Sequence, residues 1–395
     1  MKRFLIIILL AVAFCCGVKA QVVNDVAEKQ DSISVSLITY YPGSQIYELY
    51  GHSAIRVTLP DGSGVVFNYG IFDFNAPNFV YRFIKGETDY MVKGYSDRFL
   101  LYGYEGRKVV EQELNLSQEQ ALAAYQYLMI NALPQNATYR YNYVLDNCST
   151  RPRDIIERAA GGTLEYPAMQ DTTTFRKMMH QYNSNYAWSQ FGIDIALGEG
   201  LDRTLTYREQ MFVPMVLMNA FSGATIERNG EIVPLVKSTK VLNGGAEEGD
   251  IMPPTKWWAT PMAVFVLLLL ITIAFTLRDV KRGTVTRWYD SVLYGAMMLY
   301  GLLLFFLIFV STHEATSPNW NGVWLNPFYI IPAILIWIKS AKKLLYWYHF
   351  ANFAVLIVML AMWYWIPQVA NAAFYPLLLC SLVRSANYLV IYKKK

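Results

Sequence analysis

The distribution of apolar residues divides the chain into two unlike parts. Residues 21–255 have the mixed polarity of a globular chain, whereas residues 258–392 are dominated by apolar side chains. A run of about 20 apolar residues is long enough to cross a membrane as a helix. The second part therefore predicts an all-α membrane bundle of about five helices, at 258–277, 289–310, 327–338, 345–366 and 372–391. The third segment is short, and we expect it to extend into flanking residues.

Basic residues lie on one side of this predicted bundle only. Loops that contain Lys or Arg alternate with loops that contain neither, and the basic loops of membrane proteins face the cytoplasm. The soluble part is therefore expected on the periplasmic face of the inner membrane. The basic positions are Arg278, Lys281, Arg282, Arg287, Lys339, Lys342, Lys343 and Lys393–Lys395.

The first 20 residues have the pattern of a signal peptide. Lys2 and Arg3 precede an apolar run, and Val18-Lys19-Ala20 fits a small-x-small cleavage site. The mature chain then begins at Gln21. The domain plan that we expect is a signal peptide at 1–20, a periplasmic domain at 21–242, a linker at 243–256 and a transmembrane domain at 257–395.

The globular part mixes strand and helix patterns, which predicts an α+β domain. A Pro-Asp-Gly-Ser-Gly turn at 60–64 joins two short alternating segments into a hairpin. Ser117 with Gln120 forms the pattern of a helix-starting capping box. The expected strands are 33–39, 54–59, 65–69 and 109–114, and the expected helices are 117–133, 149–160 and 207–221, the last with a possible kink at Pro214.

Composition and cysteine placement narrow the chemistry. Hydrophobic residues make up 54% of the chain, and the net charge of +4 collects in loops beside the membrane segments, so no nucleic-acid partner is expected. Cys15 and Cys16 leave with the signal peptide, and Cys380 lies in a membrane segment. Cys148 is then the only cysteine of the periplasmic domain. A single thiol in a disulfide-forming compartment is either a reactive group or a buried inert residue.

Cys148 directly precedes a predicted helix, and His52 begins a predicted strand. The unpaired N–H groups and partial positive charge of a helix N-terminus favour a thiolate. They can also bind the oxyanion of a tetrahedral intermediate. A histidine within reach of the thiol would complete a nucleophile–base pair, although a lone histidine is more often a bystander. No Cys, His and acidic cluster has ligand spacing, so neither a metal nor a cofactor is expected.

Further residues are candidates for supporting roles. Asn68, on the strand paired with that of His52, is expected to orient the imidazole, with Tyr69 as the rival because strand neighbours face opposite ways. Asn147 precedes the cysteine and is a second candidate for an orienting or oxyanion role. The remaining candidates bind substrate or form ordinary surface ion pairs: Arg56, Arg151 and Arg153 for a phosphate head group, and His313 at the outer end of the second span. Arg384, inside the fifth span, has no obvious partner.

The motifs around these residues resemble a known family. The order of a hairpin histidine followed by an Asn-Cys at a helix start is similar to the permuted NlpC-type papain-like arrangement, which lecithin:retinol acyltransferase and its relatives share. The closer resemblance is to the Lnb family of lipoprotein N-acyltransferases, and it covers essentially the whole mature chain. It is carried by residues 50–57 (YGHSAIRV), 67–70 (FNYG), 146–151 (DNCSTR), 202–203 with 207–217, 319–321 and 324–327.

The resemblance implies a two-step acyl transfer. Cys148 takes an acyl chain from a membrane phospholipid, and passes it to the free α-amine of the diacylglyceryl-cysteine that begins a mature lipoprotein. His52 acts as the base. Two alternatives stay open. One is an envelope hydrolase with the same site, either a peptidoglycan amidase or endopeptidase or a lipase. The other is a non-catalytic membrane assembly factor.

Overall fold

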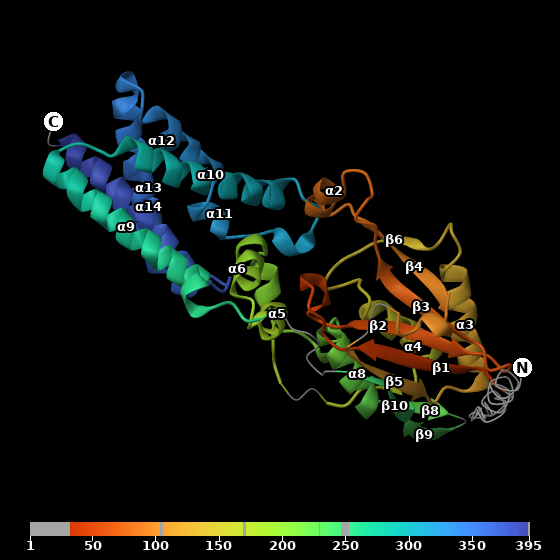
Figure 1. Cartoon of the computed structure of the whole chain (residues 1–395). Helices are drawn as coiled ribbons and strands as arrows, with labels where there is room; N and C mark the ends of the chain where they lie inside the picture. Colours follow the sequence, from red (N-terminus) through yellow and green to blue (C-terminus); the bar gives the residue numbers. More distant parts are fainter. Residues whose placement is uncertain (1–31, 103–105, 169–170, 229, 246–252, 394–395) are drawn as a thin grey trace, which may run out of the picture.

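A computed structural model describes residues 32–102, 106–168, 171–228, 230–245 and 253–393, and it has two parts (Figure 1). A sheet with helices forms the first part, and a bundle of long helices forms the second. This arrangement confirms the expected α+β domain followed by a helical membrane bundle. The signal peptide at 1–20 and much of the predicted linker lie outside the described residues.

A seven-stranded antiparallel sheet is the centre of the first part. Its strand order is β10-β5-β1-β2-β3-β4-β6, and all four predicted strands are in it. β4, β6 and β10 were not predicted. The bounds are β1 (Ser34–Tyr40), β2 (His52–Thr58), β3 (Gly64–Ile71), β4 (Asp89–Ser96), β5 (Lys108–Leu114), β6 (Thr138–Arg140) and β10 (Val236–Gly244).

The two faces of the sheet differ in what covers them. Helices α3, α4 and α8 pack on one face, where Ile55, Val57 and Phe67 enter the largest core. The other face has a smaller cluster that includes Ala54 and Val66. The helices of this part are α2 (Phe79–Lys85), α3 (Gln118–Asn131), α4 (Thr150–Ala159), α5 (Phe175–Asn183), α6 (Ala187–Ala196), α7 (Tyr207–Gln210) and α8 (Pro214–Gly223), and β7 (Leu164–Glu165), β8 (Thr225–Arg228) and β9 (Glu231–Pro234) form a small second sheet.

Local sequence signals predicted the bounds of α3 and α4 well and those of the third predicted helix poorly. Ser117 and Gln120 form the predicted capping box of α3. The single helix predicted at 207–221 is wrong, because it is two helices, α7 and α8. Pro214 stands at the first turn of α8 and has no N–H to continue a helix, and Val213 before it takes an extended conformation.

Among the described residues, four helices are long and apolar enough to cross a membrane. They correspond to the first, second, fourth and fifth predicted spans. The four helices are α9 (Pro261–Arg282), α10 (Arg287–Phe309), α13 (Lys342–Met362) and α14 (Phe374–Lys393). The third predicted span is not a single helix. It contains η6 (Pro327–Tyr329) and α12 (Ile330–Leu335), and the short helix α11 (Asn321–Trp324) precedes it.

These short helices nevertheless run the length of α10 in the opposite direction. Gly322 lies against Ile308 near the end of α10, and Gly301 in its middle lies against the backbone of Asn326. Ser291, near the start of α10, donates a hydrogen bond to the carbonyl of Ala333 at 2.7 Å. The broken segment therefore returns the chain to the basic side. Its irregular backbone is covered by α10, as membrane interiors require.

Arg384 has partners in the bundle, contrary to the prediction. Its guanidinium bonds to Asp279 at 2.8 Å and to Asp290 at 2.5 Å, and all three side chains are buried. The three residues come from α14, α9 and α10. Because an isolated buried charge is very costly, this cluster holds the three helices together.

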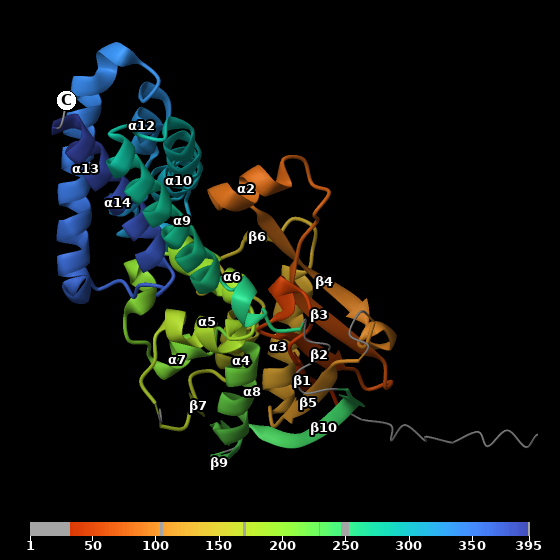
Figure 2. The same cartoon turned by 60° about the vertical axis from the view of Figure 1, so that its left-hand side comes forward.

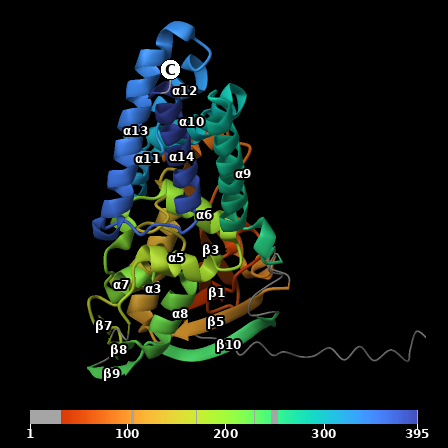
Figure 3. The ribbon, with the colours of Figure 1, turned by 90° about the vertical axis from the view of Figure 1, so that its left-hand side faces the viewer.

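The two parts are joined through α5 and α6, which lie between the sheet and the spanning helices in Figures 2 and 3. The buried Arg176 of α5 forms ion pairs with Asp194 at 3.0 Å and with Asp202 at 2.8 Å. Asn371, before α14, donates to Asp194 at 2.8 Å. Asn319 donates to the carbonyl of Ile195 at 3.0 Å. Asp202 and Asn319, which belong to the motifs that carry the family resemblance, therefore help to fix the orientation of the soluble part on the bundle.

Candidate functional site

Cys148 lies in the tight loop that starts α4. Its neighbour Asn147 is buried and uses its whole side chain to shape that loop. The Asn147 Oδ1 atom accepts from the N–H groups of Ser149 and Thr150 at 2.8 and 2.9 Å. Its Nδ2 donates to the carbonyls of Tyr143 and Phe212 at 2.8 and 2.9 Å. Both amide hydrogens are thus used, and the prediction that this side chain could donate to an oxyanion does not fit. Asn147 positions Cys148 instead.

The thiol of Cys148 is half-buried. The backbone N–H groups of Ser53 and of Cys148 itself and the hydroxyl of Tyr141 lie near enough to favour its charged form. Gly70 on β3 lies beside it with φ of 89°, and a Cβ there would be 3.5 Å from the Cys148 Cβ. The start of α4 therefore lies against the ends of β2 and β3. Ser53 directly follows His52, so the segments that carry the predicted cysteine and histidine lie at the same edge of the sheet.

His52 contacts Asn68, the residue expected to orient its imidazole. Its Nε2 lies 2.6 Å from Oδ1 of Asn68, which is paired with Ala54 across the hairpin. A carbonyl oxygen can only accept, so Nε2 carries the hydrogen and Nδ1 is the nitrogen able to take a proton. Tyr69, the rival, has its ring in the core on the opposite face, and its hydroxyl donates to Asn131 at 2.8 Å.

Burial sets the charge state of the pair. It raises the pKa of the Cys148 thiol to about 11 and lowers the pKa of His52 to about 4. At neutral pH both groups are therefore uncharged. The prediction that the helix N-terminus would favour a thiolate is wrong for this state, because desolvation outweighs the N–H donors. A nucleophilic attack by this thiol would therefore require a base that removes its proton during the attack rather than beforehand.

Tyr141 belongs to the site and was missed. A Cβ on Gly70 would be 3.5 Å from the Cys148 Cβ and 3.7 Å from the Tyr141 ring, so these two side chains are neighbours. The Tyr141 ring stacks on Tyr90 with centroids 4.1 Å apart. Burial raises the pKa of Tyr141 well above its ordinary value, so the hydroxyl stays protonated and remains a donor. The only sequence signal was the alternation of tyrosines at 139, 141 and 143 just before the cysteine.

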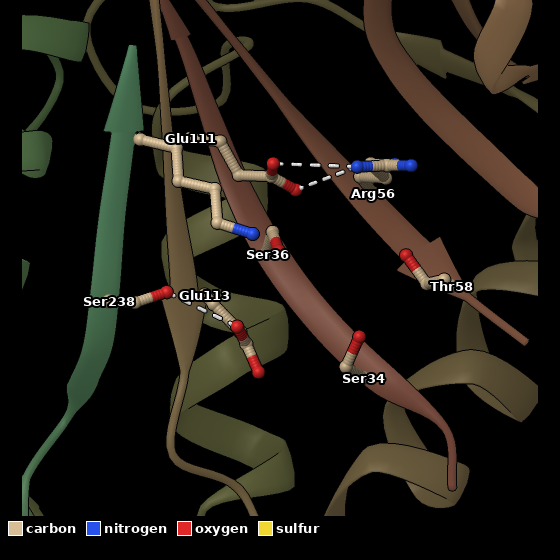
Figure 4. Close-up of a pocket in the computed structure, with 8 residues that line it drawn as sticks. Ser34, Ser36, Arg56, Thr58, Glu111, Glu113 and Ser238 are labelled. Atoms are coloured by element: carbon tan, nitrogen blue, oxygen red, sulfur yellow. Dashed lines mark hydrogen bonds and ion pairs between the residues drawn. The ribbon is translucent and has the colours of Figure 1, made fainter. Parts of the chain in front are cut away.

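Two of the three arginines expected to bind a phosphate, Arg56 and Arg151, are already neutralised by carboxylates. The third, Arg153, is buried and pairs with Asp154 at 2.7 Å. Arg56 bonds to Asp97 at 2.9 Å and to Glu111 at 3.1 Å, in a polar groove on the open sheet face (Figure 4). Arg151 forms a two-point ion pair with Asp146 at 2.6 and 2.7 Å. Since a compensated guanidinium attracts an anion weakly, the head-group prediction is not supported for any of the three.

His313 lies at the outer end of α10, as predicted, but it contacts the soluble part. Its Nε2 bonds to the carbonyl of Phe83 at 2.8 Å, and its ring lies against that of Phe83. This contact attaches α2 to the spanning helix. The geometry therefore supports a positioning role for His313 rather than the expected contact with substrate.

The fold and the site define a class: membrane proteins whose periplasmic α+β domain has a cysteine, a histidine and an asparagine at one edge of the sheet. Comparison with protein families identifies the chain more closely. Residues 25–181 match the Lnb N-terminal periplasmic domain, and residues 254–395 match the Lnb transmembrane domain. The chain belongs to the Lnb family, which is related to lipoprotein maturation. No curated protein and no solved structure matches it.

Proposed function

We propose that this protein is a thiol-dependent lipoprotein N-acyltransferase of the inner membrane. Cys148 takes an acyl chain from a phospholipid of the outer leaflet and passes it to the α-amine of a diacylated lipoprotein. The observation that supports the proposal best is the placement of Cys148 beside the His52–Asn68 pair in a chain of the Lnb family. The mature protein comprises the catalytic domain at 21–242, the linker at 243–256 and the transmembrane domain at 257–395, after removal of residues 1–20.

In the first half-reaction the thiol sulfur attacks the ester carbonyl of the phospholipid. Nδ1 of His52 takes the thiol proton as the C–S bond forms. The N–H groups of Ser53 and Cys148 and the hydroxyl of Tyr141 lie near the sulfur, and we propose that they donate to the oxyanion that develops next to it. The C–O bond then breaks. The lysophospholipid alkoxide leaves with the proton from His52, and the acyl chain stays on Cys148 as a thioester.

In the second half-reaction the neutral α-amine of the lipoprotein attacks the thioester. An amide bond forms, the C–S bond breaks, and His52 carries one amine proton to the departing sulfur. A thiol suits both steps, because sulfur is a good nucleophile and a good leaving group. Burial of the pair limits the water that would otherwise hydrolyse the thioester.

The test is acylation of the purified full-length protein in nanodiscs that contain phospholipid labelled in its acyl chain. We expect label on Cys148 through a bond that hydroxylamine cleaves, with an equal amount of lysophospholipid. A diacylated lipopeptide with a free α-amine should then remove the label as an amide, whereas an N-acetylated lipopeptide should not. Cys148→Ala should take no label. Cys380→Ala is the matched control and should label normally, since Cys380 is buried in the bundle.

Three results would contradict the proposal. Free fatty acid that accumulates with or without lipopeptide would indicate a lipase. Cleavage of peptidoglycan by the same preparation would indicate an amidase or endopeptidase. A folded protein that yields neither label nor lysophospholipid would favour the non-catalytic assembly factor.

A further inference from the structure

Helix α2 and the loop before it expose large apolar side chains. Phe74, Val80, Tyr81 and Phe83 are 59%, 68%, 53% and 49% exposed. They lie on one short stretch of chain, and we call them the α2 apolar face. A soluble domain rarely leaves so many large apolar groups together in water, so the α2 apolar face indicates a contact with an apolar partner.

The α2 apolar face is fixed at the outer end of a spanning helix (Figures 1 and 2). The N–H of Thr312 donates to the carbonyl of Lys85 at 2.8 Å, and the hydroxyl of Ser311 donates to the carbonyl of Ile84 at 2.9 Å. The ring of Tyr81 contacts that of Phe306, with centroids 6.1 Å apart. Phe306 lies within α10, before its end at Phe309. Tyr81 therefore reaches the depth at which α10 is surrounded by lipid.

The charges of α2 are compensated within the domain. Arg82 pairs with Asp89 at 2.6 Å, and Lys85 pairs with Glu87 at 2.7 Å. Neither cation is thus available to attract an anionic head group or an acidic protein. The partner that this chemistry fits is a hydrocarbon chain, and the neighbouring hydrocarbon is the outer leaflet around α10.

A continuous series of aromatic contacts leads from α2 to the thiol. Ring centroids are 6.0 Å apart for Phe83 and Phe79, 5.9 Å for Phe79 and Phe72, and 5.1 Å for Phe72 and Tyr90. Tyr90 then stacks on Tyr141, and Tyr141 and Cys148 both lie against Gly70. We call the rings of Phe83, Phe79, Phe72, Tyr90 and Tyr141 the aromatic path. It joins the membrane surface to the site without a charged side chain among its members.

We infer that the α2 apolar face is inserted in the outer leaflet and that the aromatic path receives an acyl chain of a membrane phospholipid, so that the ester at its head reaches Cys148. The inference rests on the proposed function for the identity of this lipid as the acyl donor. The attachment of α2 to α10 supports it, because the binding surface is continuous with the surface that the spanning helices present to lipid.

The first experiment is independent of catalysis. Full-length Cys148→Ala protein is placed in nanodiscs with a phospholipid that carries a diazirine in its acyl chain, and crosslinked residues are found by mass spectrometry after irradiation. We expect crosslinks at residues 72–83 in addition to those on α9, α10 and α13. Crosslinks confined to the spanning helices would overturn the inference, whatever the protein catalyses.

The second experiment compares two acyl donors in the same preparation. The variants Phe74→Ser and Val80→Ser change the two most exposed side chains of the α2 apolar face, and neither residue belongs to the aromatic path, so the fold should be kept. We expect acylation of Cys148 by nanodisc phospholipid to slow at least tenfold in the double variant, and acylation by soluble p-nitrophenyl butyrate to stay within twofold of wild type. Tyr102→Ser is the matched control, since Tyr102 is 76% exposed and lies outside the α2 apolar face and the aromatic path.

Equal slowing with both donors, or no slowing with phospholipid, would overturn the inference. Failure of the wild type with every ester would refute the proposed function instead and leave the crosslinking result standing.

Discussion

Replacing Asn68 by aspartate should shift the pH dependence of acylation, because it keeps the oxygen that orients His52 and adds a negative charge. That oxygen lies 2.6 Å from Nε2 of His52. Two unit charges about 4 Å apart interact by about 4 kcal/mol at an effective dielectric constant of about 20, and about 1.4 kcal/mol corresponds to one pKa unit. The half-buried position screens part of this energy. The pKa of His52, about 4 in the wild type, should therefore rise by roughly one to three units.

The direction in which the acid limb of the pH–rate profile moves follows from the role of His52 as the base. Acylation needs neutral His52, so the rate falls as the pH drops below the pKa of His52. The acid limb should thus move from near pH 4 in the wild type to between about pH 5 and pH 7 in Asn68→Asp. The assay is single-turnover release of lysophospholipid in nanodiscs between about pH 3.5 and pH 8, a range that brackets both limbs.

Two further variants make this result interpretable. Asn68→Ala removes the hydrogen bond without adding charge, and should lower the plateau roughly tenfold to a hundredfold without raising the pH of the limb. Asn131→Asp adds the same charge on the other face of the sheet, beside Tyr69, and should leave the limb in place. An unshifted limb in folded Asn68→Asp protein would refute the role assigned to the His52–Asn68 contact.

Three other outcomes follow from the structure. Tyr141→Phe should slow acylation about a hundredfold without changing the unfolding temperature, because the stacked ring stays and only one oxyanion donor is lost; a rate within threefold of wild type would exclude that donor. Arg384→Met should destabilise the bundle by about 3–5 kcal/mol, because it leaves Asp279 and Asp290 buried without their partner. The measurement is thermal unfolding in detergent. An unchanged unfolding temperature would show that the cluster does not hold the helices together. A cytoplasmic reporter fused after Lys343 should be active and a periplasmic one inactive, and the reverse result would contradict a membrane crossing by the broken segment.

What the sequence predicted correctly depends on local signals. The turn at 60–64 fixes the register of the β2–β3 hairpin, and this register brings Asn68 to the side of the sheet that His52 faces. The capping box of α3 is likewise contained within four residues. Strand alternation predicted that Asn68 and Tyr69 face opposite sides of the sheet, but not which of the two contacts His52. The cysteine was found because it is the only one in its domain.

What the sequence could not predict depends on distant contacts. Helix α2 has no clear helical periodicity, and residues more than two hundred positions away along the chain hold its end. The break in the third span follows from the close approach of Gly301 to Asn326. The expected sign of the Cys148 pKa shift was wrong, because burial of the thiol is a property of the folded domain. Tyr141 comes close to the thiol only in the folded domain, where the segment that follows β6 lies beside the start of α4.

The uncharged resting state of Cys148 and His52 gives the two half-reactions different pH requirements. A base with a pKa of about 4 is too weak to deprotonate an ammonium group, whose ordinary pKa at a chain N-terminus is about 8. In the proposed transfer, the lipoprotein must therefore bind as the neutral amine. Discharge of the acyl-enzyme should rise with pH up to about 8, whereas its formation should already be constant above about pH 5. Water has no such titration in this range, so a hydrolase would discharge its acyl-enzyme at a rate independent of pH there. Measuring both rates on one labelled preparation separates transfer from hydrolysis by their pH dependence alone.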